Sequence, residues 1–281
     1  MSLNWYPGHM AKAKRKLQEQ LSYADVVIEV CDARLPLSSR NPDLDSMTAH
    51  KQRILLLNKV DLADTSATKG WESHFRKAGV TVMSLNSIQM AAKVFPLVER
   101  AVAEKVERAR DRGFNKTVRA VVVGVPNVGK STLINSMKGK ASIKTADRPG
   151  VTRSVQWFRV TPYLEMMDSP GLLWPKLNDP LAARRLAYIG SIKDEIHDTM
   201  HLSIQLLEEL ILTHPVMLME RYKLADDSLR GQALLEAICR SRGYLLRAGE
   251  LDLERGAAAV LDEFRDGRIG RITLELPERT G

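Results

Sequence analysis

Gly124-Val-Pro-Asn-Val-Gly-Lys-Ser131 decides the fold of this 281-residue chain. The stretch fits the pattern G-x-x-x-x-G-K-[ST], in which backbone N–H groups cradle phosphates, the lysine meets the β and γ charges, and the hydroxyl reaches Mg²⁺. An apolar run, residues 118–123, leads into it, and residues 132–137 are expected to form the helix whose N-terminus faces the anion. The pattern predicts that the phosphates of a nucleotide lie against Asn127, Val128, Gly129, Lys130, Ser131 and Thr132.

A second element, Asn58-Lys-Val-Asp61, comes earlier in the chain and matches the guanine-reading element of GTPases. The Asp61 carboxylate is suited to accept hydrogen bonds from the N1–H and exocyclic amine of guanine, and adenine presents an acceptor where guanine presents a donor. The sequence therefore predicts a preference for GTP over ATP, with Asn58 and Lys59 orienting the loop. A second base-contacting loop is expected at Ser84, Asn86 and Ser87, although this stretch departs from the common Ser-Ala form.

The order of these two elements is the reverse of that in an ordinary GTPase, so the chain looks like a circularly permuted GTPase. Compact runs rich in Val, Ile and Leu are typical of buried parallel strands, and helical stretches separate them. We expect strands at 24–31, 53–57, 80–85 and 118–123, a hairpin at 155–160 and 163–167, and a charged amphipathic helix at 94–112. The fold class predicted is α/β, with a parallel-rich sheet covered by helices.

From about Asp179 the pattern changes. Apolar residues at helical spacing over 192–212, 228–241 and 253–264 predict a small α-helical domain. We place the circularly permuted GTPase domain at residues 1–178 and the helical domain at residues 179–281. The alternating stretch 270–276 is interpreted as a short strand or a tail of the second domain.

Two further elements are expected to sense the γ-phosphate. Asp168-Ser-Pro-Gly171 fits D-x-x-G, in which Asp168 holds Mg²⁺ through water and the Gly171 N–H meets the γ-phosphate. Arg148-Pro-Gly-Val-Thr-Arg153 supplies Thr152 as a first-switch ligand of Mg²⁺, with a simple turn at its Pro-Gly step as the alternative interpretation. The expected magnesium ligands are therefore Ser131, Thr152 and, through water, Asp168.

The group that activates water is not the usual one. Ras-type GTPases use a Gln after D-x-x-G, whereas this chain has Leu172 and Leu173 there. His9, on a Gly-flanked N-terminal segment, is a candidate to orient the attacking water. The alternative is that His9 caps the helix that follows it or contacts RNA.

The formal net charge of +8 is unevenly distributed along the chain. Residues 1–184 carry 29 Lys and Arg against 17 Asp and Glu, whereas residues 185–281 carry 13 against 17. A positive field around the nucleotide-binding half suits a polyanion such as nucleic acid bound through its phosphates. Ordinary basic solubility is the alternative.

No apolar run approaches the roughly 20 residues needed to cross a bilayer. The first nine residues also lack the apolar core of a secretory signal. We therefore expect a soluble intracellular protein with no membrane partner. The two cysteines, Cys31 and Cys239, lie far apart without metal-ligand spacing, which disfavours a disulfide framework or a zinc site.

Two signatures complete the pattern: Trp5-Tyr-Pro-Gly-His-Met-Ala-Lys-Ala13 and Asp32-Ala-Arg-Leu-Pro36. Together with the four elements quoted above, they closely resemble the ribosome biogenesis GTPase A family, the YlqF/YawG-like circularly permuted GTPases. The resemblance covers almost the whole chain, including its helical C-terminal part.

The resemblance implies a GTPase that assists late maturation of the large ribosomal subunit in the bacterial cytoplasm. Its GTP form would bind the subunit precursor, with its rRNA and ribosomal proteins, and its GDP form would leave; the subunit would stimulate hydrolysis. The family further implies that His9 is recruited to activate water. It also implies that Asn127 helps to coordinate K⁺ beside the phosphates, in addition to the Mg²⁺ cofactor. A loop-shaping hydrogen bond is the alternative role of Asn127.

The residues that contact RNA stay open at this point. Arg34, in the second signature, contacts rRNA, braces the nucleotide loop or forms an internal salt bridge. A local basic strip in the helical domain consists of Arg240, Arg242 and Arg247; the basic amino-terminal half includes Lys12, Lys14, Arg15 and Lys16. The alternative for either group is that its basic side chains only form a solvent-exposed helix face and contact no RNA.

Two functional classes also stay open. The first is a GTP-hydrolysing assembly factor for the large subunit. The second is a GTP-regulated binding module for another structured RNA, in which slow hydrolysis serves as a timer. A metabolic P-loop kinase is disfavoured because Asn58-Lys-Val-Asp61 selects guanine.

Overall fold

The structure, a computed structural model, describes residues 15, 17–140, 157–169, 179–192, 198–247 and 249–277. The expected site residues His9, Thr152 and Gly171 lie outside these ranges. The chain divides into two compact units. The first comprises Met1–Val60, Asp64–Asn178 and Thr273–Gly281, and the second comprises Asp61–Ala63 and Asp179–Ile272.

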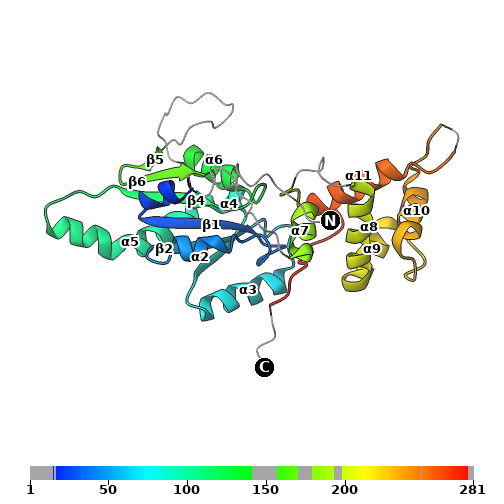
Figure 1. Cartoon of the computed structure of the whole chain (residues 1–281), viewed down its shortest axis with the longest axis horizontal. Coiled ribbons are helices and arrows are strands. Elements are labelled where there is room, and N and C mark those ends of the chain that lie inside the picture. The colour runs from blue at the N-terminus through cyan, green and yellow to red at the C-terminus, as the bar shows by residue number, and fades with distance from the viewer. Residues whose placement is uncertain are drawn as a thin grey trace. The chain divides into compact units, whose positions relative to one another are not determined.

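A six-stranded sheet lies at the centre of the first unit, in the order β3-β2-β1-β4-β6-β5 (Figure 1). Only β5 is antiparallel to its neighbour, and the other described pairs are parallel. The strands are β1 (Val26–Asp32), β2 (Gln52–Asn58), β3 (Thr81–Leu85), β4 (Val118–Val123), β5 (Trp157–Thr161) and β6 (Leu164–Asp168). Every residue of β1 is buried, as expected for a central parallel strand covered on both faces. The predicted α/β fold class is confirmed.

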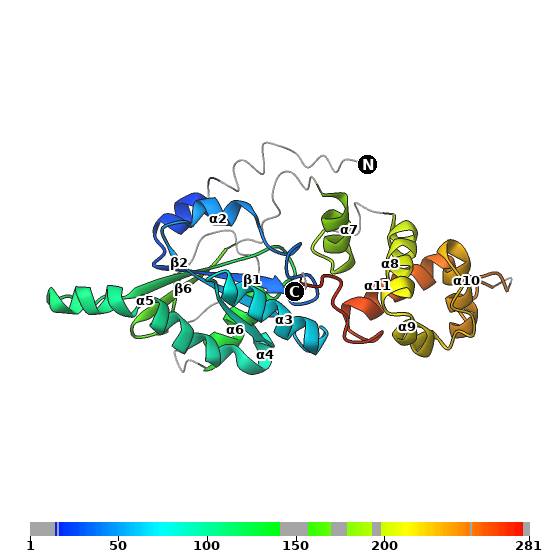
Figure 2. The same ribbon diagram turned by 90° about the horizontal axis from the view of Figure 1, so that it is seen from below.

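Helices cover both faces of this sheet. Their bounds are α2 (Asp43–Met47), α3 (Thr65–Lys77), α4 (Ser87–Met90), α5 (Val94–Asp111) and α6 (Lys130–Lys140), with a 3₁₀ turn at Ala91–Lys93. Helix α2 lies on one side of the sheet and α4 and α6 lie on the other (Figures 1 and 2). Helix α5 contacts β1, β2 and β4, and α3 contacts β3.

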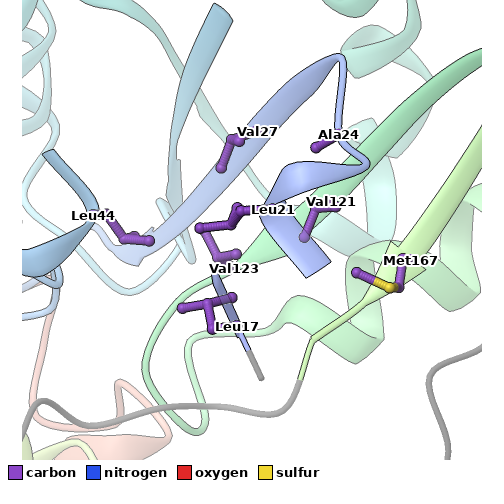
Figure 3. Close-up of a cluster of buried hydrophobic side chains, with 8 residues drawn as sticks. All are labelled: Leu17, Leu21, Ala24, Val27, Leu44, Val121, Val123 and Met167. Carbon is purple, nitrogen blue, oxygen red and sulfur yellow. The ribbon is translucent and has the colours of Figure 1, made fainter. Parts of the chain in front are cut away.

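One hydrophobic cluster shows how the α2 side is filled (Figure 3). Leu17 and Leu21, from the helical residues 17–22, and Leu44 of α2 are 1–3% exposed. They pack against side chains of β1, β4 and β6, namely Val27, Val121, Val123 and Met167. Burial of such apolar side chains contributes about 1.5–3 kcal/mol each, which fixes the sheet against the N-terminal helix.

The parallel strands bring the polar motifs to one edge of the sheet. Asp32 ends β1, Asn58 ends β2 and Asp168 ends β6, while β4 ends one residue before Gly124. Asp32 and Asn58 are also register partners across β1 and β2. Ligands of open α/β sheets bind at the carboxyl ends of the strands, so this edge is where the nucleotide site is expected.

The second unit contains helices packed around α8. They are α7 (Pro180–Tyr188), α8 (Thr199–Thr213), α9 (Pro215–Tyr222), α10 (Gly231–Arg242) and α11 (Leu253–Arg265). Leu206, Leu207 and Leu210 of α8 are fully buried. Aspartates begin three of the helices, because the side chains of Asp179, Asp198 and Asp252 accept hydrogen bonds from first-turn N–H groups.

Polar contacts also hold these helices together. Glu263 of α11 pairs with Arg221 of α9 through two hydrogen bonds of 2.9 and 2.6 Å. Arg265 donates to the carbonyls of Ala187 and Tyr188 at the end of α7. Within the residues described, no single helix is long and apolar enough to cross a membrane. Helices α8 and α9, which meet at a sharp bend, together pass by length and composition only.

The structure refines several expected boundaries. The helix expected at 192–212 begins only at Thr199 because Asp198 caps it, and residues 193–197 are outside the described ranges. The short helices α7 and α9 were not predicted. Residues 270–276 form no strand and run as a tail, of which Thr273 onward groups with the first unit and not with the helical domain. A backbone hydrogen bond, from Leu274 to the Arg34 carbonyl, joins this tail to the first unit. Side-chain hydrogen bonds of Thr273, Glu275 and Trp71 add to it.

Gly256 in α11 provides a test of packing in the second unit. A Cβ at this position would lie 2.2 Å from Cys239 Sγ on α10, which is 0% exposed. Alanine favours a helix over glycine by about 1 kcal/mol, whereas overpacking costs about 1–3 kcal/mol. We expect Gly256→Ala to lower the thermal midpoint of unfolding in the wild-type background and to raise it in a Cys239→Ala background. An identical effect in both backgrounds would show that the sulfur is not the obstacle.

Candidate nucleotide-binding site

The predicted phosphate loop connects β4 to α6. Helix α6 begins at Lys130, so the loop lies at a helix N-terminus, where backbone N–H groups and the helix dipole favour anions. Gly124 has a φ of +152°, and a Cβ there would lie 2.3 Å from the Val30 carbonyl oxygen of β1. Only glycine fits this close approach, which seats the loop against the sheet.

Asn58 joins the guanine-reading element to the phosphate loop. Its side chain is 2% exposed, and its Nδ2 donates to the Val128 carbonyl at 2.7 Å. Its Oδ1 accepts hydrogen bonds from the backbone N–H and hydroxyl of Ser87, at 3.0 and 2.7 Å. Gly129 has a φ of +99°, and a Cβ there would lie 2.2 Å from Asn58 Nδ2. The structure thus brings together three loops that are distant in sequence.

The other expected base-loop residues have local partners. Asn86 caps α4, accepting hydrogen bonds from the N–H groups of Ile88 and Gln89. The backbone N–H of Ser84 donates to Glu72 of α3 at 2.8 Å. Of the three residues predicted for this loop, Ser87 is the one whose side chain contacts the Asn-Lys-x-Asp element.

Lys59 is held by a charged cluster at the end of β1. It has a φ of +61°, and its Nζ lies 3.3 Å from Asp32 Oδ2. Arg34 binds the same carboxylate through two hydrogen bonds of 2.9 and 2.8 Å and is 1% exposed. Burial alone would raise the pKa of Asp32, but Arg34 and Lys59 hold that pKa well below its ordinary value.

The position of Arg34 decides among its three possible roles. Because its guanidinium is buried against Asp32, it forms an internal ion pair, and Lys59 lies beside the same carboxylate. Contact of Arg34 with rRNA is excluded by its burial. Asp61 is exposed three residues after the end of β2.

Lys130 is buried in the phosphate loop. It is 6% exposed, and its Nζ donates to the Val125 carbonyl at 2.8 Å. Burial lowers the pKa of Lys130 from 10.5 to about 8, and the nearby Asp168 partly opposes this shift. A cation that is poorly solvated by its surroundings gains most from a phosphate charge.

Asp168 and Ser131 form the part of the expected magnesium site that the structure describes. Ser131 Oγ donates to Asp168 Oδ2 at 3.1 Å, and the buried Asp168 Oδ1 accepts no hydrogen bond from the described residues. Burial raises the pKa of Asp168, and the Ser131 hydroxyl and Lys130 lower it in part. A hydroxyl beside an unsatisfied carboxylate oxygen fits Mg²⁺, which prefers oxygen ligands.

No cluster of three or more His, Cys, Asp or Glu suited to a metal occurs in the described ranges.

Asn127 lies at the exposed tip of the loop with a φ of +62°. Asparagine tolerates this left-handed conformation better than most residues, which supports the loop-shaping role. Its expected K⁺ role stays a prediction. Val128 is buried, and its carbonyl holds Asn58, whereas Thr132 is exposed on the first turn of α6.

Known proteins are similar to this chain in sequence and in fold. Residues 119–224 match a family described as 50S ribosome-binding GTPase. A protein of Bacillus cereus named ribosome biogenesis GTPase A is 42% identical, covering 100% of this chain and 96% of its own length. The chain belongs to the ribosome biogenesis GTPase A family. It is a GTPase, and the resemblance predicted from its motifs is confirmed.

Solved members of the family agree with the fold. A GNP-bound structure of YlqF from T. maritima is 28% identical, with a TM-score of 0.68 over 95% of this chain and 99% of that chain. A GDP-bound structure of the same protein has a TM-score of 0.69 at 28% identity, over 94% and 100% of the two chains. Both comparisons include the helical C-terminal region as well as the permuted GTPase domain.

The structure also shows functional candidates that the motifs did not predict. Asp32 ends the buried strand β1 and matched a family signature, yet nothing in the sequence paired it with Lys59. Thr273 and Glu275 lie in a tail without a recognisable motif and contact loops of the GTPase unit. Hydrogen bonds between residues more than 200 positions apart leave no local signal.

Burial of the charged Lys130 side chain is expected to lower the stability of the nucleotide-free protein, although the same side chain is expected to bind GTP. Because the folded state lowers the Lys130 pKa to about 8, the unfolded chain binds this proton more tightly, and the charged side chain costs stability below pH 8. We expect nucleotide-free Lys130→Met to be more stable than wild type at pH 7 by roughly 1–3 kcal/mol, with the difference closing towards pH 10. Urea unfolding at both pH values measures this.

The same Lys130→Met protein is expected to lose GTP binding, because the cation that meets the β and γ charges is gone. Lys69→Met, at an exposed position of α3, serves as the control and should change neither property. Equal stability of Lys130→Met and wild type at pH 7 would contradict the burial penalty.

Proposed function

We propose that this protein is a GTP-hydrolysing assembly factor for late maturation of the large ribosomal subunit, which binds the precursor in its GTP state and leaves after hydrolysis. The observation that carries the proposal is the 42% identity, over 100% of the chain, to a protein named ribosome biogenesis GTPase A. The description 50S ribosome-binding GTPase for the matching family model also supports a large-subunit partner.

In this proposal the phosphate loop binds the phosphates of GTP and the Asn-Lys-x-Asp loop binds its guanine base. Backbone N–H groups of Asn127–Ser131 cradle the phosphates, and Lys130 meets the β and γ charges. Asp61 reads the N1–H and exocyclic amine of guanine. Asn58 keeps the two loops in register because its amide spans Val128 and Ser87.

Ser131 and Asp168 are the described residues that would hold Mg²⁺, with Thr152 and Gly171 completing the sensor of the γ-phosphate. The ion would supply positive charge beside the transferring phosphoryl group. Ser131 Oγ donates to Asp168 Oδ2, so the hydroxyl and the carboxylate lie side by side.

Hydrolysis in this proposal uses His9 to orient water, since Leu172 and Leu173 stand where Ras-type enzymes carry a Gln. Asn127 is proposed to help hold K⁺, whose charge would act where an arginine finger acts elsewhere. Both roles rest on the family resemblance.

Basic residues of the GTPase domain are proposed to contact rRNA. The strip expected in the helical domain is partly engaged within that domain: Arg242 donates to the Arg221 carbonyl at 2.9 Å and stacks on Tyr222. Arg240 pairs with Glu236 on the same helix. Residues 1–184 carry the net positive charge, so they suit a polyanion better. Such a role in bacteria places the protein in the cytoplasm.

The proposed partner and catalyst are tested by one set of turnover measurements. GTP hydrolysis by wild type is expected to accelerate at least about tenfold with large-subunit precursor, more strongly in K⁺ than in Na⁺, and not with tRNA. His9→Ala should retain GTP binding and lose most of the acceleration. Equal stimulation by tRNA and by the large subunit would favour the alternative, a binding module for another structured RNA.

Guanine recognition by Asp61 is tested by exchanging its acceptor for a donor. Asp61→Asn should weaken GTP binding by about 1–3 kcal/mol and improve binding of xanthosine triphosphate, whose C2 carbonyl accepts the hydrogen bond that the new amide donates. Calorimetry with both nucleotides measures the exchange. An unchanged preference for GTP would remove Asp61 from the proposed site.

A further inference from the structure

The C-terminal tail of the first unit, residues Thr273–Pro277, is bound to the loops that carry the guanine-reading element. Thr273 is 2% exposed, and its hydroxyl accepts a hydrogen bond from the backbone N–H of Asp64 at 3.1 Å. The next residue, Leu274, donates its backbone N–H to the Arg34 carbonyl at 3.0 Å. The Glu275 carbonyl accepts the indole N–H of Trp71 at 2.7 Å.

Glu275 makes the most demanding of these contacts. Its side chain is 7% exposed, and its carboxylate accepts the backbone N–H groups of Leu37 at 2.7 Å and of Ser38 at 3.1 Å. The Ser38 hydroxyl donates to the same carboxylate. A buried carboxylate needs such donors, and charge-assisted hydrogen bonds are stronger than neutral ones. Glu275 therefore fixes the backbone of the loop that follows β1.

That loop carries the charged cluster that holds Lys59. Within it, the Asp32 N–H donates to Ser39 Oγ at 3.0 Å and the Ser39 hydroxyl donates to the Leu35 carbonyl at 2.5 Å, which closes the loop on itself. Asp32 then binds both Arg34 and Lys59. A continuous set of hydrogen bonds and ion pairs thus runs from Glu275 to the Asn-Lys-x-Asp element.

The tail also holds the far end of the guanine loop. Asp64, three residues after Asp61, caps α3 with its side chain, and its own N–H is bound to Thr273. At the near end, the Asn58 carbonyl accepts the Ala33 N–H at 2.8 Å. The loop that carries Asp61 is therefore anchored on both sides, and one of the two anchors is the tail itself.

We propose that Thr273 and Glu275 are positioning residues for guanine recognition: the tail holds the loop of Asp61 in the geometry that distinguishes guanine from other purines. A carboxylate that reads two hydrogen-bond donors must be held to within about 0.5 Å, which requires supporting contacts such as these. The inference rests on the proposed role of Asp61 as the base reader.

The test is the ratio of dissociation constants for GDP and inosine diphosphate, which lacks the exocyclic amine that Asp61 reads. In full-length protein, Glu275→Gln and Thr273→Val should each reduce the preference for GDP about tenfold, a change of about 1.4 kcal/mol. Thr273→Ser keeps the hydroxyl and should retain the wild-type ratio. Glu107→Gln, at an exposed position of α5, is the matched control for loss of a carboxylate.

This ratio separates positioning from a general effect on stability. A merely destabilised protein binds both nucleotides less well and keeps their ratio, because both carry the same phosphates and ribose. An unchanged ratio in Glu275→Gln and Thr273→Val would overturn the proposal, whatever happens to the thermal midpoint. If Glu275→Gln does not fold, Thr273→Val, a substitution of nearly equal volume, decides alone.

Different results would contradict the proposed role of Asp61 and the proposed role of the tail. A wild-type protein that binds ADP as tightly as GDP would remove guanine recognition itself. A wild type that prefers GDP, with tail variants that prefer it equally, would remove only the role of Thr273 and Glu275.

Discussion

The buried side-chain amide of Asn58 is the interaction on which the nucleotide site depends. A buried amide must use both its donor and its acceptor, and here the donor goes to Val128 in the phosphate loop and the acceptor to Ser87. Position 129 must be glycine for this contact to form, because a Cβ there would clash with the Asn58 amide. The amide therefore fixes the spacing between the Asn-Lys-x-Asp element and the predicted phosphate loop. It does so in a chain where these elements occur in permuted order, because parallel strands bring them to one edge of the sheet.

Charged residues near this amide form two groups that differ in how well their charges are paired. Asp32 pairs with both Arg34 and Lys59, so this group links the loop that follows β1 to the Asn-Lys-x-Asp element. Lys130 and Asp168 are less well matched, since burial lowers the pKa of the first and raises that of the second. Incomplete compensation of this kind is typical of sites that bind a charged ligand, whose phosphates and metal supply the missing partners.

Residues near the C-terminus of the chain form hydrogen bonds with loops of the GTPase unit. After the helical unit, residues Thr273–Glu275 bind loops of the first unit around the Asn-Lys-x-Asp element through main-chain and side-chain hydrogen bonds. In this chain, the loop that follows β1 is fixed by Glu275, 237 and 238 residues away from its partners.

The sequence by itself determined the nucleotide chemistry, the α/β fold class and the position of the described strands, because phosphate loops and buried parallel strands are local patterns of residue type and spacing. It missed α7 and α9, which are short and begin at Pro180 and Pro215. It also left the role of Arg34 open. Only the tertiary structure decided that Arg34 is buried against Asp32, that Asn58 spans two loops and that Glu275 holds the loop that follows β1. Apart from the Asp32–Arg34 pair, these contacts join residues from separate loops, and no local pattern encodes which buried polar groups will satisfy one another.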